Sequence, residues 1–136
     1  MDRVVVDTNV LVSALIGKGN PRRVLEAIFS GKVSFALSSS ILAEYEAVVQ
    51  RPKFSRYPEF VLYASPTLRS LQSIARFTEP DIIIRVCPDP DDDKFLVLAV
   101  AVQAQYLVTG NKRHFPLRNY KSTRIVSPGE FVALFK

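Results

Sequence analysis

Acidic side chains are concentrated at two places in this basic chain. Four aspartates fall within five residues of the segment CPDPDDDKFLVLAVA, which spans positions 87–101, and Asp7 directly follows three valines. Carboxylates packed this closely repel one another unless water, a helix start or a cation compensates their charge. Because the chain has a net charge of +5 and a pI near 9.6, we interpret the acids first as a divalent-metal site on a protein that attracts anions.

Each acidic feature also has a purely structural interpretation. The run 91–93 could open a helix, where each acid is favoured by about 0.3–1 kcal/mol, although three in succession exceed what a helix start needs. Asp7 taken alone reads as a helix N-cap more readily than as a ligand. A calcium-binding loop is not expected, because the run lacks the D-x-D-x-D-G spacing and the later glutamate.

The composition indicates one domain spanning residues 1–136, with 48% hydrophobic residues to form its core. The lone Cys87 excludes an internal disulfide and fits a reducing cytoplasm. The lone His114 excludes a histidine-based zinc site and argues against a Ser-His-Asp triad. We expect no signal peptide, because the start of the sequence lacks a charged n-region, a long apolar stretch and a small-residue cleavage site, and no membrane span, because no apolar run approaches 18 residues.

Hydrophobic periodicity predicts alternating strands and helices. Strands are expected at Arg3–Val6, Val33–Leu37, Ile82–Val86, Tyr106–Thr109 and Arg124–Val126. Helices are expected at about 9–16, 21–30, 39–50, 91–105 and from 128 onward, and residues 53–80 allow one or two more. This order predicts an α/β fold, a three-layer α/β/α sandwich around a parallel sheet of about five strands.

Polar side chains follow several of these strands at the edge where parallel sheets bind ligands. Asp7 ends the first strand, Asp93 lies in the acid run, Asn111 follows the fourth strand, and Glu44 lies near the start of the helix after the second strand. Oxygen ligands of this kind suit Mg²⁺ or Mn²⁺. Helical periodicity alone leaves Glu44 and Glu46 as equal candidates, one at each edge of the apolar stripe.

Four segments of the chain resemble, in order, the motifs of PIN-domain ribonucleases. They are VVVDTNVLVSAL, SSSILAEYEAVVQRPKF, DPDDDKFLVLAVAVQAQYLVTGNKRHF and IVSPGEFVALF, and the match runs from residue 3 to residue 135. The chain is most similar to a subgroup regarded as toxin components of bacterial or archaeal toxin–antitoxin systems, akin to VapC.

The resemblance assigns roles to individual residues. It implies that Asp7, Glu44 and Asp93 are the catalytic, metal-binding acids, with Asp92 as the fallback for Asp93. The family's fourth acid falls at Asn111, whose amide can ligate a metal but carries no charge, which leaves a second metal in question. Thr8, Asn9 and Thr109 are expected to orient the acids or bound water by hydrogen bonds.

The chemistry implied is metal-dependent hydrolysis of RNA phosphodiester bonds, leaving a 5′-phosphate and a 3′-hydroxyl. A bound Mg²⁺ lowers the pKa of a water and stabilises charge that develops on the phosphate. Basic residues are then needed to hold the substrate. The favoured candidates are Lys112, Arg113, His114 and Arg118 in the basic loop 110–120, and then Arg51, Lys53 and Arg56; Arg22 and Arg23 read more readily as solvated surface.

The partners expected are an RNA substrate, a cognate antitoxin and a second copy of the chain. Tyr45, Tyr57 and Phe115 could stack on bases, although Tyr45 lies on an apolar helix stripe and reads as core. Two alternative classes remain open. One is a PIN-fold module that binds RNA or protein without turnover, and the other is a receiver-like signalling domain, ranked last because no lysine has the required position.

Overall fold

The computed structural model describes residues 1–115 and 117–135; Pro116, within the predicted basic loop, and Lys136 lie outside the described residues. The helices are α1 (Thr8–Ile16), α2 (Asn20–Phe29), α3 (Ser39–Val49), α4 (Pro58–Ile74), α5 (Asp93–Val102) and α6 (Pro128–Leu134). Short 3₁₀ turns are η1 (Pro52–Phe54), η2 (Pro90–Asp92) and η3 (Lys112–His114). The strands are β1 (Arg3–Val6), β2 (Ser34–Leu37), β3 (Arg76–Phe77), β4 (Tyr106–Val108), β5 (Asn119–Tyr120) and β6 (Thr123–Val126).

The strands form one sheet of six in the order β3-β2-β1-β4-β6-β5. All neighbouring pairs are parallel except β5 with β6, which is antiparallel. The predicted α/β fold with a largely parallel central sheet is therefore confirmed, with six strands where about five were expected. No helix of the described residues is long and apolar enough to cross a membrane.

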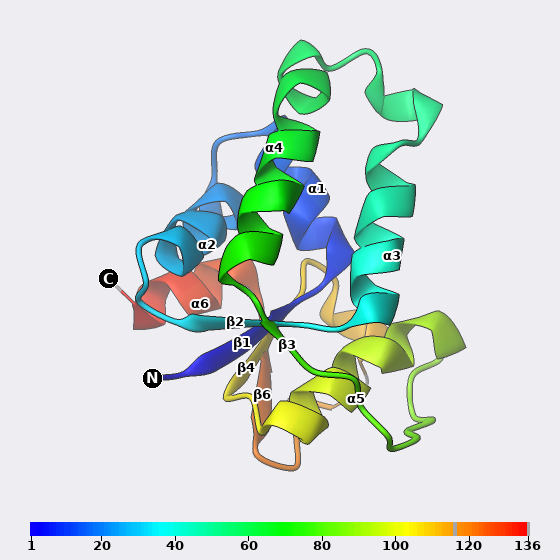
Figure 1. Cartoon of the computed structure of the whole chain (residues 1–136). Helices are drawn as coiled ribbons and strands as arrows, with labels where there is room; N and C mark the ends of the chain where they lie inside the picture. The colour runs from blue at the N-terminus through cyan, green and yellow to red at the C-terminus, as the bar shows by residue number, and fades with distance from the viewer. Residues whose placement is uncertain (116, 136) are drawn as a thin grey trace.

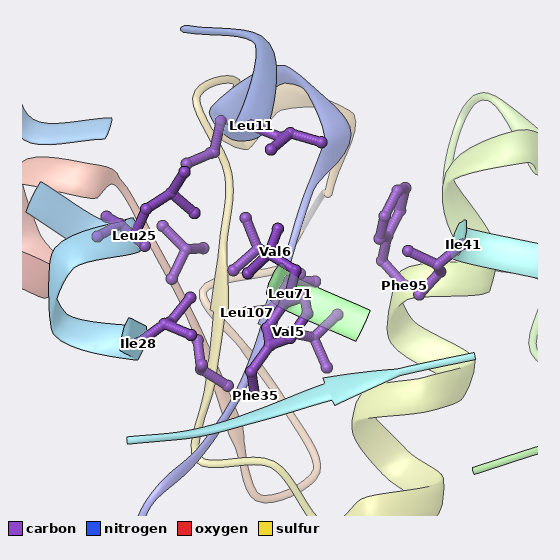
Figure 2. Close-up of a cluster of buried hydrophobic side chains, with 14 of the residues drawn as sticks. Val5, Val6, Leu11, Leu25, Ile28, Phe35, Ile41, Leu71, Phe95 and Leu107 are labelled. Carbon is purple, nitrogen blue, oxygen red and sulfur yellow. The ribbon is translucent and has the colours of Figure 1, made fainter. Parts of the chain in front are cut away.

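The central strand β1 is buried on both faces of the sheet. Its three valines are at most 1% exposed, as expected for a strand covered by helices on each side. Figure 1 shows α2 and α6 on one side of the strands and α5 on the other. In Figure 2, Leu25 and Ile28 of α2 lie on one side of Val6, and Phe95 of α5 lies on the opposite side. Burial of each such side chain contributes about 1.5–3 kcal/mol.

The predicted strand at Ile82–Val86 is wrong. Strand β3 occupies the sheet edge instead, pairing with β2 through Ala36 and Leu37. The Glu79 carboxylate then accepts hydrogen bonds from the amide and hydroxyl of Ser39, and Pro80 has no N–H to continue a ladder. The chain consequently leaves the sheet, and Ile83 is 79% exposed in an irregular segment.

The helix predicted at 91–105 is shorter at both ends. Asp91 and Asp92 belong to η2, and α5 begins at Asp93. The helix ends at Val102 because Gln103 adopts a left-handed conformation, with φ of 54°. The single helix α4 accounts for most of the ambiguous region 53–80 and contains Pro66 in its interior.

Candidate functional site

The order of the strands reverses between β1 and β4. From β1 the chain adds β2 and β3 on one side, and then crosses to add β4 and β6 on the other side. Parallel sheets bind ligands outside the carboxyl ends of their strands at such a reversal point. Asp7 follows β1 and Thr109 follows β4, and the Thr109 hydroxyl donates a hydrogen bond of 2.7 Å to Asp7 Oδ2.

Asp7 is only 4% exposed, although it carries an ionisable group. It occupies the N-cap position of α1, yet its side chain accepts no capping hydrogen bond and turns toward Thr109 instead. Burial raises the pKa of the Asp7 carboxyl, and the negative charge of Glu44 adds to the rise, while the Thr109 hydrogen bond opposes it. A carboxylate buried in this position is therefore stabilised when it binds a cation or a proton.

Glu44 comes to the same place from α3. The side chain of Ser38 caps this helix, which directs Glu44 toward the start of α1. The Thr8 hydroxyl donates to Glu44 Oε2, and Lys94 Nζ donates to Oε1 over 2.5 Å. The alternative candidate, Glu46, is exposed and lines a hollow between α3 and α4. Of the two glutamates, the structure thus brings Glu44 to the site.

Asp92 is the aspartate of the acid run whose pKa responds to the charges of Asp7 and Glu44. Burial raises the pKa of the Asp92 carboxyl to about 6, and the charge of Asp7 is the next contribution, with Glu44 adding a smaller one. His114 opposes this rise, with Nδ1 lying 3.6 Å from Asp92 Oδ2. Three carboxylates from α3, the end of β1 and the start of α5 therefore share one electrostatic environment.

Asp93, the acid expected in the third position, hydrogen-bonds to the backbone before η2. Its Oδ1 accepts hydrogen bonds from the backbone amides of Cys87, at 2.9 Å, and Val86, at 3.2 Å. Burial alone would raise the pKa of Asp93, but these hydrogen bonds outweigh it and the pKa is lowered. The residue lines a hollow beneath the irregular segment that precedes η2. Asp93 Oδ1 thus holds that segment onto α5.

Asn111 uses both ends of its amide inside its own loop. Its Oδ1 accepts a hydrogen bond of 3.2 Å from the amide of Arg113, and its Nδ2 lies 3.0 Å from His114 Nε2. If Nδ2 is the donor, the His114 ring carries its proton on Nδ1, toward Asp92. The position expected to complete the metal site therefore caps η3 and orients His114.

The polar residues expected to orient the site are all close to it. Thr8 contacts Glu44, and Thr109 contacts Asp7 and accepts from the amide of Asn111 at 3.1 Å. Asn9 Oδ1 accepts a hydrogen bond of 2.9 Å from the Gly110 amide. A Cβ at Gly110 would lie 3.2 Å from that same oxygen, so glycine permits the close approach of α1 to the end of β4.

The predicted RNA-binding residues divide into two groups. Lys112, Arg113, His114 and Arg118 are exposed in the loop after β4, where Lys112 forms a 2.8 Å ion pair with Glu130 and His114 lies near Asp92. Arg51 and Lys53 lie beyond the far end of α3, where helix geometry puts Arg51 about 10 Å along the axis from Glu44. Figure 1 shows that α3 carries them away from the sheet.

Two of the three aromatic candidates for base stacking are core residues. Tyr45 is 1% exposed and donates a 2.5 Å hydrogen bond to the carbonyl of Val6, in agreement with its place on an apolar stripe. Phe115 is 2% exposed and packs into the hydrophobic core. Tyr57 is half-buried, with Arg56 over its ring at 5.3 Å. Tyr57 alone retains surface for a base.

The fit of this donor set to a metal is partial. Within the part of the chain that the structure describes, no three acidic, histidine or cysteine side chains are arranged to hold a metal ion as they stand. The chemistry of the set nevertheless suits a divalent cation, because Asp7 and Asp92 have raised pKa values from burial and mutual repulsion. Glu44 is held away from an open ligating geometry by Thr8 and Lys94.

Sequence reasoning missed Lys94, although it contacts one of the predicted acids. Its partner Glu44 lies 50 positions earlier in the chain, so no local spacing links the two residues. Directly after three aspartates, a lysine reads as part of a solvated charged run. The only available signal is that Lys94 immediately follows the acid run at the start of a strongly apolar helix.

Comparison with known proteins identifies the class that this fold and site define. The PIN domain family matches residues 3–113, which is most of the chain. The chain therefore belongs to the PIN domain family, as its four motifs suggested.

Two relatives match nearly the whole chain. The uncharacterized protein MJ1680 of Methanocaldococcus jannaschii is 32% identical over 143 residues, covering 98% of this chain and 92% of the relative. The crystal structure of VapBC2 from Rickettsia felis, bound to a DNA fragment from its promoter, is similar with a TM-score of 0.60. That similarity covers 92% of this chain and 98% of the other, at 19% identity, and it supports the fold.

Proposed function

We propose that this protein is a Mg²⁺- or Mn²⁺-dependent endoribonuclease. The observation that carries the proposal is the cluster of Asp7, Glu44 and Asp92 at the reversal point of a PIN-family sheet, where burial and mutual repulsion raise the pKa values of two of the three acids. PIN domains are generally nucleases. The cluster is costly without a cation and faces a basic loop suited to a polyanion.

The chain's own residues would divide the work as follows. Asp7, Glu44 and Asp92 would hold the ion, and Thr109 would fix the orientation of Asp7. We place Asp92 in the third position instead of Asp93, because Asp93 Oδ1 already accepts hydrogen bonds from two backbone amides. When bound, the ion would activate a water for attack on phosphorus and stabilise charge on the phosphate oxygens.

The basic loop would position the RNA. Arg113 and Arg118 are exposed in the loop that follows β4, and His114 of this loop lies close to Asp92. Their positive charges would hold the phosphates against the acid cluster, a contact that the uncompensated carboxylates alone would oppose. Arg51 and Lys53 would extend the contact along the strand of RNA beyond the cleavage point.

A matched pair of variants on α3 tests the proposed activity. Glu44→Gln removes the carboxylate that contacts Thr8, whereas Glu46→Gln removes an exposed carboxylate two residues away. We expect Mn²⁺-dependent cleavage of a single-stranded RNA to be lost in Glu44→Gln and in Asp7→Asn, and retained in Glu46→Gln. Equal cleavage by Asp7→Asn and the unaltered protein, with contaminating nuclease excluded, contradicts the site.

We further propose that the protein acts in the cytoplasm as the toxin of a toxin–antitoxin pair. The support is the fold shared with VapBC2, a similarity that spans nearly the whole of both chains. Induced expression should then arrest growth, and Asp7→Asn should relieve the arrest. A small open reading frame beside the gene, encoding a DNA-binding protein that restores growth when co-expressed, would identify the antitoxin. Arrest that persists unchanged in Asp7→Asn contradicts toxicity through this site.

A second candidate function is a PIN-fold module that binds RNA or a partner without turnover. Two observations favour it: Asn111 stands where the family has a fourth acid, and Lys94 already holds Glu44. Calorimetric titration with Mn²⁺ separates the two candidates. A site for catalysis binds the ion and loses it in Asp7→Asn, whereas a binding module shows no such difference.

A further inference from the structure

Lys94 and Glu44 form the shortest ion pair of the described residues, and they form it inside the candidate site. Lys94 Nζ lies 2.5 Å from Glu44 Oε1, and each side chain is about one quarter exposed, at 23% and 25%. The other three ion pairs are 2.8–4.0 Å long and each includes a side chain at least 46% exposed. A charged hydrogen bond of this length and shielding is stronger than an ordinary surface pair.

Both oxygens of Glu44 are occupied in this arrangement. Thr8 donates to Oε2 and Lys94 donates to Oε1, so a metal ion would have to compete with both donors for this carboxylate. The Thr8 contact is neutral, and only Lys94 brings a charge. Lys94 therefore compensates one of the three carboxylates that would otherwise repel each other most strongly.

Lys94 is placed for this role by two elements of the fold. It is the second residue of α5, whose remaining first-turn positions are buried against the sheet, while α3 packs against α5 and presents Glu44. Its aliphatic stem crosses the gap between these helices and its ammonium ends at the acids. Helix α5 does not need a lysine at this position for its own formation, because it is strongly apolar beyond this point.

We propose that Lys94 is a resident counter-cation, which holds Glu44 in the metal-free protein and releases it when a divalent cation binds. Lys94 is in this sense a positioning residue: it keeps Glu44 near Asp7 and Asp92 and sets the metal concentration at which the site fills. This inference rests on the proposed metal-dependent function. It predicts opposite effects of one substitution on the metal-free and the metal-bound protein.

The test uses Lys94→Met, which keeps the aliphatic stem and removes the charge. Lys32→Met is the control for net charge, because Lys32 is exposed near the amino end of β2, opposite the site, and contacts only the Phe135 carbonyl in the described structure. Lys94→Arg is the control that retains charge. All three and the unaltered protein are titrated with Mn²⁺ by calorimetry and are unfolded thermally in a chelator.

We expect Lys94→Met to bind Mn²⁺ about threefold to tenfold more tightly than Lys32→Met, because an ion pair of this strength no longer competes for Glu44. In the chelator, Lys94→Met should unfold about 3 °C or more below Lys32→Met, since its carboxylates lose their counter-charge. Lys94→Arg should bind Mn²⁺ no more tightly than the unaltered protein.

Unchanged or weaker Mn²⁺ binding by Lys94→Met overturns the proposal. So does a metal-free Lys94→Met that is as stable as Lys32→Met, and this arm needs no metal. If no variant binds Mn²⁺, the metal site of the proposed function fails, and metal-free unfolding still decides whether Lys94 acts as a counter-charge. Mn²⁺ binding by Lys94→Met alone would show that Lys94 keeps the site closed.

Discussion

Two adjacent aspartates are expected to affect stability in opposite directions. Burial and the charge of Asp7 raise the pKa of the Asp92 carboxyl, whereas Asp93 accepts hydrogen bonds from two backbone amides. Replacing the first should stabilise the metal-free protein at neutral pH, and replacing the second should destabilise it. The contrast tests the assignment of roles without any assumption about the reaction.

The expected change in the free energy of unfolding for Asp92→Asn follows from the pKa of Asp92. A rise from 3.8 to about 6 corresponds to about 3 kcal/mol of unfavourable free energy in the ionised state. The folded protein holds this proton more tightly than the unfolded chain, so stability falls as pH rises from about 4 to about 6. Partial solvent exposure and the favourable helix start reduce the effect, which leaves a gain of about 1–2 kcal/mol for Asp92→Asn at pH 7.

The expected change in the free energy of unfolding for Asp93→Ala follows from the hydrogen bonds that Asp93 accepts. Asp93→Ala leaves the half-buried amides of Val86 and Cys87 without their acceptor, at a cost of about 2–3 kcal/mol in total. The assay is urea unfolding in a chelator at pH 4 and pH 7. Asp91→Asn is the matched control, because Asp91 is exposed and carries the same charge, and its change should stay within about 0.5 kcal/mol.

Two results would refute this reasoning. One is a loss of stability in Asp92→Asn at pH 7 as large as that in Asp93→Ala. The other is an unchanged dependence of stability on pH between 4 and 7 in Asp92→Asn, since that variant lacks the group held responsible for it. Either result would mean that Asp92 does not face the acids of the site.

Three further outcomes are expected. Asn111→Asp should raise Mn²⁺ affinity several-fold in calorimetry, because it adds a charge beside the acids; unchanged affinity would place residue 111 outside the site. Ser127→Ala should lower the free energy of unfolding by about 1 kcal/mol, because Ser127 forms a capping box with Glu130 at the start of α6. Replacing Arg113 and Arg118 together by serine should weaken RNA binding and reduce the salt dependence by about 1.4 in log–log slope, measured by fluorescence anisotropy; an unchanged slope would exclude both from phosphate contact.

The part of the site that the sequence could predict is the part built by the sheet. Asp7 and Thr109 each follow a buried apolar run, and parallel strands bring such positions to one edge whatever the loops do. The hydrogen bond between them joins residues 102 positions apart. Hydrophobic periodicity was sufficient to predict these two positions, because it indicates which segments are buried, and the buried segments are the neighbouring strands of the sheet.

Periodicity failed where a segment is apolar but not buried. The isoleucines at 82–84 have the composition of a central strand, yet Ile83 is largely exposed. The edge of β2 is instead paired with the shorter segment Arg76–Phe77, which directly follows α4. Composition does not indicate which of two segments pairs with the edge strand of a sheet.

The choice between Asp92 and Asp93 was undetermined for a geometric reason. In a 3₁₀ turn, with three residues per turn, successive side chains point about 120° apart. The turn η2 and the start of α5 therefore separate neighbouring aspartates: Asp89 accepts from the Asp91 amide, Asp91 is exposed, Asp92 faces the site, and Asp93 holds the preceding segment.

It follows that the density of acids in the run is not itself the metal site. Of the four carboxylates, Asp92 is the one whose pKa is raised by the charge of Asp7, and the charge that partners Glu44 comes from Lys94, the residue after the run. The acid run and the lysine after it therefore supply the site with one anion, Asp92, and one cation, Lys94, at the start of α5. That combination allows Asp7, Glu44 and Asp92 to lie together in the absence of metal, at an electrostatic cost that binding of a divalent cation would remove.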